Sequence, residues 1–242
     1  VKTLKRHARE TGPLRDLHVF LQHLPELCAD DAEIRAALQI WFEREAASHH
    51  KKLAKRLKSK RYQESLEHWR NLIDSRKFQK LAATLRPKDI RRAVERRMKE
   101  FNKRTAELMH TSPDEDIHRL RKQLKRIRYL MELDAKTWKR NLKTLKERQE
   151  LYGRFQDLHV QILLLDQFRQ AAPEVLPAAL NGIVETLENH KANARKRILT
   201  LGGLDGAPLW HPVLRRTMPT LRQRDPHPAQ TPAWQSDLCR HP

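Results

Sequence analysis

Apolar residues recur at steps of three and four along most of the chain, which is the spacing of one face of an α-helix. The clearest stripe lies in residues 114–133 and consists of Ile117, Leu120, Leu124, Ile127 and Met131. A second stripe follows Pro87 and consists of Ile90, Val94, Met98 and Phe101. This pattern predicts an all-α fold made of amphipathic helices that bury one face each.

Local signals place the ends of these helices. Asp30-Asp31 supplies an N-terminal cap, and Thr111-Ser112-Pro113-Asp114 combines a capping hydroxyl, an early proline and an acidic first turn. Gly12-Pro13 is expected to interrupt or kink the first helix. The predicted helices cover residues 2–24 with this break, about 31–58, 62–72, 77–85, 87 onward, about 114–133, 138–169 and 174–201.

An internal repeat organises the chain. Residues 4–24, LKRHARETGPLRDLHVFLQHL, align without a gap to residues 145–165, LKERQELYGRFQDLHVQILLL, at an offset of 141 residues. The repeat predicts two pseudo-symmetric antiparallel helical bundles, with an N-terminal half at 1–110, a C-terminal half at 111–202 and a proline-rich tail at 203–242. The counterpart of the His118 helix would fall before residue 1, so we expect the first half to be incomplete, without its first helix.

The net charge of the chain indicates which kinds of partner to expect. Fifty Lys and Arg residues stand against 30 Asp and Glu residues, a formal net charge of +20. A field of this sign attracts polyanions: nucleic acid, an anionic membrane or polyphosphate. The cations also lie in rows, because they repeat with the helical period on faces other than the apolar stripes.

The strongest row lies on the helix at residues 114–133. Its members are candidate phosphate-binding residues, and almost no acid interrupts them: His118, Arg121, Lys122, Lys125 and Arg128. Like charges stacked in this way repel one another, so an anionic partner is expected to compensate them. Rows on other helices supply a supporting set, Lys5, Arg9, Arg44, Lys51, Lys55, Lys99, Lys146 and Lys196. Together the rows predict a shared basic groove.

The identical DLHV segments predict structural positions. Asp16 and Asp157 lie among apolar residues, and we expect each carboxylate to pair with an arginine from a neighbouring helix. Gly12 and Gly153 precede these segments at matching positions of the repeat and are assigned a structural role as well.

The sequence contains no recognisable catalytic or metal-binding pattern. A glycine-rich phosphate loop, a metal-ligand spacing and a nucleophile–histidine pair are all missing from it. We therefore expect a protein that is not an enzyme and that binds no metal and no cofactor. No apolar segment is long enough to cross a membrane, so a membrane partner is not expected. Cys28 and Cys239 are expected to be reduced in a cytoplasmic protein.

The motifs together resemble the CHAD family, the conserved histidine α-helical domain. Members carry an H-x-x-R-K-x-x-K-x-x-R-Y helix, which His118–Tyr129 matches, and an LG-x-x-RD-x-x-V segment. The second motif is matched by Gly12, Arg15, Asp16 and Val19, and again by Gly153, Asp157 and Val160. The likeness covers residues 1–201. It departs from the family pattern where Gln156 replaces the arginine of the second RD pair and where the first H-x-x-R helix is absent.

The resemblance implies two four-helix bundles around a basic cleft that binds inorganic polyphosphate. It also implies association with polyphosphate granules, or fusion to a triphosphate tunnel (CYTH) domain. Two other functions stay open at this stage. The chain could be a basic nucleic-acid-binding protein, although it shows no base-reading module. It could also be an accessory domain of a CYTH enzyme.

Overall fold

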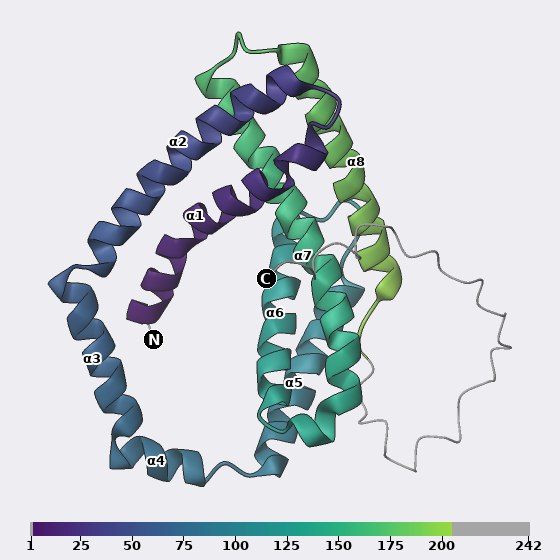
Figure 1. The fold of residues 1–242 in the computed structure, drawn as a ribbon. Helices are drawn as coiled ribbons and strands as arrows, with labels where there is room; N and C mark the ends of the chain where they lie inside the picture. Colours follow the sequence, from purple (N-terminus) through teal and green to yellow (C-terminus); the bar gives the residue numbers. More distant parts are fainter. Residues whose placement is uncertain (1, 205–242) are drawn as a thin grey trace, which may run out of the picture. The chain divides into compact units, whose positions relative to one another are not determined.

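The computed structural model describes residues 2–204 (Figure 1). Within that range the chain forms helices and no strands, which confirms the all-α prediction. The helices are α1 (Lys2–Leu27), α2 (Ala32–Leu57), α3 (Lys60–Asp74), α4 (Arg76–Ala83), α5 (Pro87–Ala106), α6 (Asp114–Glu132), α7 (Ala135–Ala171) and α8 (Pro177–Leu201). The tail predicted for residues 203–242 lies outside the described residues, apart from its first two.

Helix α1 corrects one prediction. It runs without interruption from Lys2 to Leu27, with Pro13 and Pro25 inside it, so Gly12-Pro13 does not break the helix. The residues after this pair bury a continuous stripe that begins at Leu14 and Leu17. Packing of an amphipathic face contributes most of the stability of a protein helix, and here it outweighs the backbone hydrogen bond that Pro13 cannot donate.

The other helix starts follow the local signals. The side chain of Asp31 accepts hydrogen bonds from the backbone N–H groups of Glu33 and Ile34, both at 3.1 Å. Ser59 and Ser75 cap α3 and α4 in the same way. Pro87 opens α5, where its missing N–H costs nothing, and the acids Asp114, Glu115 and Asp116 occupy the first turn of α6.

The helices pack in consecutive pairs. Helix α1 lies against α2, α5 against α6, α6 against α7, and α7 against α8, while a smaller contact joins α1 to α7 (Figure 1). The predicted stripes of α5 and α6 are buried, and Ile117, Leu124 and Ile127 are completely inaccessible. Helix α7 is the longest and contributes the largest buried side chains, Trp138, Tyr152 and Phe155. Helices α3 and α4 contribute no buried residue.

Polar contacts fasten the end of α8 to the helices beside it. Arg148 on α7 donates to the carbonyl oxygens of Gly202 at 2.8 Å and Leu201 at 3.1 Å. Asn102 on α5 exchanges two hydrogen bonds with the backbone of Leu204. Gly202 ends α8 with a φ of 59°, in the region that a residue without a Cβ reaches most easily.

Candidate functional site

Helix α6 separates an apolar face from a cationic face, as the sequence predicts. Its apolar stripe is buried, whereas Arg121, Lys125 and Arg128 are half-buried and Lys122 is exposed. The three half-buried cations lie three or four residues apart and therefore share one face. A half-buried cation is screened less by water than one on a free surface, so its field acts over a longer distance.

His118 begins this face and is fixed by α7. Its Nδ1 donates a hydrogen bond to Oε1 of Gln156. Burial lowers the pKa of His118 from its ordinary value, and the nearby Lys122 acts in the same direction, while the bond to Gln156 opposes the shift. His118 is therefore mainly neutral near pH 7 and presents a hydrogen-bonding ring rather than a permanent charge.

Arg15 on α1 lies within electrostatic range of the cations on α6. It acts electrostatically on Lys125 together with Arg121 and Arg128. Asp16 on α1 and Asp157 on α7 lie within electrostatic range of the same cations. We call this group, which consists of Arg15, Asp16, Arg121, Lys125, Arg128 and Asp157, the central cluster.

The central cluster holds four cations against two carboxylates, and one of these cations, Arg128, also pairs with Glu132 at 3.2 Å. Burial lowers the pKa of Lys125, and the surrounding arginines Arg121, Arg15 and Arg128 lower it further. Burial raises the pKa of Asp16, and Asp157 adds to this shift, while Arg15 and Arg121 oppose it. The Nε of Arg121 is buried and has no hydrogen-bond partner among the described residues. The cluster therefore carries excess positive charge and a donor that an anion could use.

The two predicted structural aspartates have no close arginine partner. No ion pair to Asp16 or Asp157 is present within residues 2–204. Arg121 lowers the pKa of Asp16 by electrostatic attraction over a distance, without forming an ion pair. Gly12 and Gly153 are not required by close packing either, because a Cβ built at either position meets no atom within 4 Å.

The supporting cations are dispersed over the molecule. They lie on α1, α2, α5, α7 and α8, all of them exposed, and none has an ion pair within the described part of the chain: Lys5, Arg9, Arg44, Lys51, Lys55, Lys99, Lys146 and Lys196. The supporting set is thus spread over five helices, and the shared basic groove stays a prediction.

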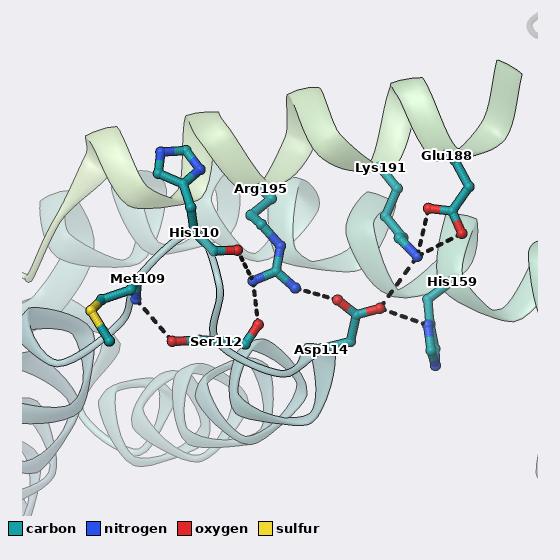
Figure 2. Close-up of polar contacts among 8 residues, drawn as sticks. All are labelled: Met109, His110, Ser112, Asp114, His159, Glu188, Lys191 and Arg195. Atoms are coloured by element: carbon teal, nitrogen blue, oxygen red, sulfur yellow. Dashed lines mark hydrogen bonds and ion pairs between the residues drawn. The ribbon is translucent and has the colours of Figure 1, made fainter. Parts of the chain in front are cut away.

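Two cations of α8, Lys191 and Arg195, form ion pairs inside the fold. Asp114, in the first turn of α6, binds Arg195 and Lys191 of α8 and His159 of α7 (Figure 2). The distances to Asp114 Oδ2 are 3.3 Å from Lys191 Nζ and 3.1 Å from His159 Nδ1. Arg195 also donates to the carbonyl oxygen of Ser112 at 2.6 Å. Lys191 and Arg195 therefore join helices and do not form an open basic face.

A separate cleft of about 380 Å³ lies where α5 ends and α6 begins. Its charged lining contains three acids and three cations: Glu100, Lys103, Arg104, Glu107, Asp116 and Arg119. None of the predicted phosphate-binding residues lines it. The acids in this lining oppose a polyanion, so the central cluster is the better candidate.

Residues 2–204 contain neither a metal-binding cluster nor a membrane-spanning helix. No group of three or more His, Cys, Asp and Glu side chains is arranged to hold a metal ion. No helix within the same range combines the length and the apolar character that crossing a membrane requires.

The motifs on α1, α6 and α7 agree with a comparison against known protein families. The model of the CHAD domain matches residues 1–166. The chain belongs to the CHAD family. The match contains the whole central cluster and ends within α7, so α8 with Lys191 and Arg195 lies beyond it. No match was found among curated proteins or among solved structures.

Sequence reasoning missed two members of this CHAD site. Arg15 was part of the CHAD motif but was not among the candidate binding residues, and the structure places it near Lys125. Gln156 was noted only as a replacement for arginine, and the structure makes it the partner of His118. The position of Arg15 within the motif was a usable signal, because the neighbouring Asp16 is identical in the two DLHV segments.

Proposed function

We propose that this CHAD protein is a non-catalytic module that binds inorganic polyphosphate through the central cluster. The observation that carries the proposal is the convergence of Arg15, Arg121 and Lys125 from two helices. Each phosphate of a polyphosphate carries a negative charge, and neighbouring phosphates can meet neighbouring cations. Binding would relieve the repulsion that lowers the pKa of Lys125.

In this proposal the arginines, the lysines and the histidine make different contacts with phosphate. Arg15, Arg121 and Arg128 offer forked guanidinium donors to phosphate oxygens, and Lys125 and Lys122 offer point charges. His118 donates a hydrogen bond while neutral and adds charge when it is protonated. Neutralising the polyanion also releases its bound counterions, which favours association entropically. In a cell, binding of this kind would bring the protein to polyphosphate granules.

The decisive test replaces two central cations of the α6 row by glutamates. Arg121→Glu with Lys125→Glu should weaken binding to long-chain polyphosphate at least about a hundredfold, because two favourable charges become repulsive. Binding is measured by titration at physiological salt, with duplex DNA of equal charge as a competitor. Arg121→Gln with Lys125→Gln is the milder variant that shows the same direction with less risk to folding.

The matched control lies on the same helix. Arg119→Glu with Arg126→Glu makes the same change of net charge, on exposed residues of the opposite face of α6. This control should lose little affinity. Equal losses in the two double variants, with both folded by circular dichroism, would contradict the proposed site. Preference for DNA over polyphosphate would replace the proposal with nucleic-acid binding.

A further inference from the structure

Helices α3 and α4 expose large apolar side chains. The exposed fractions are 52% for Ile73, 41% for Phe78, 67% for Leu81 and 51% for Leu85, and Leu72 is also exposed. Phe78 and Leu81 are three residues apart and share one side of α4, and Leu85 follows two residues after the helix ends. A single exposed leucine is ordinary, but a run of them on neighbouring helices marks an interaction surface.

The chain from residue 75 onward, which includes α4, is strongly basic, whereas the cations of α3 are balanced by Glu64, Glu67 and Asp74. Residues 75–88 contain five Lys or Arg residues and no acid, so the charge lies beside the apolar side chains. Arg86 pairs with Asp89 at 3.1 Å. Arg76, Lys77 and Lys80 have no ion pair within the described residues, and all three are exposed. The exposed apolar residues together with these three cations are called the α3–α4 surface below.

We propose that the α3–α4 surface binds an anionic lipid membrane. A helix with apolar side chains on one face and Lys or Arg beside them lies in the plane of a membrane interface. The apolar side chains enter the boundary between headgroups and acyl chains. The cations meet the negative headgroups, which attract basic segments close to the membrane. This inference goes beyond polyphosphate binding and does not depend on it.

The positive net charge of the chain favours an anionic lipid surface, rather than a second copy of the chain, as the partner of the α3–α4 surface. Two copies with a net charge of +20 repel each other, and pairing two α3–α4 surfaces would bring like cations together. A surface-bound helix does not cross the bilayer, so the lack of a spanning helix among residues 2–204 does not bear on it. The proposal revises the sequence expectation of no membrane partner, which considered spanning segments only.

The test is flotation with vesicles made of equal parts phosphatidylglycerol and phosphatidylcholine, at low and at high salt. Wild-type protein should float with these vesicles and retain part of this binding at high salt, where purely electrostatic attraction is screened. Phe78→Ser with Leu81→Ser and Leu85→Ser should reduce the salt-resistant part at least about tenfold. These side chains are exposed, so the variant should keep the wild-type melting temperature and polyphosphate affinity.

The control removes three exposed apolar side chains elsewhere. Ile40→Ser, Met109→Ser and Leu163→Ser are on α2, in the α5–α6 loop and on α7, with exposed fractions of 70%, 64% and 47%. This variant should float like wild type. Equal flotation of all three proteins would overturn the inference, as would loss of all wild-type binding at high salt. Self-association that disappears in the α3–α4 variant, without flotation, would assign the surface to a second copy and would also overturn it.

Discussion

At the scale of single residues, Asp16 has two possible roles in the central cluster. Its carboxylate either stabilises the fold through an ion pair or repels an anion bound nearby. The sequence predicts that its carboxylate fixes a neighbouring arginine. In the structure burial raises its pKa from the ordinary value of 3.8, and Asp157 adds to the shift. A carboxyl with a raised pKa in the folded state costs stability once it ionises, so the cost appears as the pH rises through that pKa. The charge of Asp16 would therefore oppose an anion bound at the central cluster, and its raised pKa does not indicate a stabilising ion pair.

We expect Asp16→Asn to bind polyphosphate about threefold to tenfold more tightly at pH 7, because one repulsive charge is removed near the ligand. Its free energy of unfolding should equal or exceed that of wild type at pH 7, and the advantage should vanish at acid pH. Binding titrations and urea unfolding measure the two effects.

Asp166→Asn is the matched control for Asp16→Asn. Asp166 lies on α7 and is paired with Arg169, outside the central cluster, so its substitution should leave the affinity nearly unchanged. Reduced stability of Asp16→Asn at pH 7 would support the ion-pair interpretation instead.

At the scale of helices, Asp114 is the main polar junction. It joins the start of α6 to α7 and α8 through His159, Lys191 and Arg195 (Figure 2). Burial raises its pKa, but Lys191 and Arg195 outweigh this effect and hold the pKa below its ordinary value of 3.8. A lowered pKa of this kind stabilises the folded state above the ordinary pKa, and the contribution is lost as the pH falls through the lower folded value.

Asp114→Asn should therefore lower the free energy of unfolding by about 2 kcal/mol at pH 7, because it leaves Lys191 and Arg195 without their shared partner. Urea unfolding as a function of pH measures this loss, which should shrink only at strongly acid pH. Glu115→Gln, the next residue of the same helical turn, is exposed and should change stability very little. A stable Asp114→Asn would show that this junction adds little to the packing of the helices.

Helix boundaries could be predicted where the cause is local. Asp31, Pro87 and the acids after Pro113 act within one turn of the helix that they start, so sequence alone locates them. The contact between Asp114 and Arg195 joins residues 81 positions apart, and no local pattern distinguishes Arg195 from an exposed cation. Arg15 differs from Arg195 because the CHAD motif marks it, although its place near Lys125 depends on the packing of α1 on α7.

At the scale of the whole molecule, the net charge of +20 attracts any polyanion. This general attraction comes mainly from exposed cations, such as Lys51 and Lys55, and salt screens it strongly. The half-buried cations Arg121 and Lys125 are screened less. Two contributions to binding should therefore be separable by salt, one spread over the surface and one confined to the central cluster.

We expect the affinity for polyphosphate to fall linearly with the logarithm of salt concentration and to stay measurable at physiological salt, where duplex DNA no longer binds. Lys51→Glu with Lys55→Glu should weaken binding mostly at low salt. Arg121→Glu with Lys125→Glu should remove the affinity that persists at high salt, because that part belongs to the central cluster. Titrations at four or more salt concentrations give the slopes. If the two double variants lost the same affinity at every salt concentration, the cluster would be no more than a part of the general positive surface, and charge alone would explain binding.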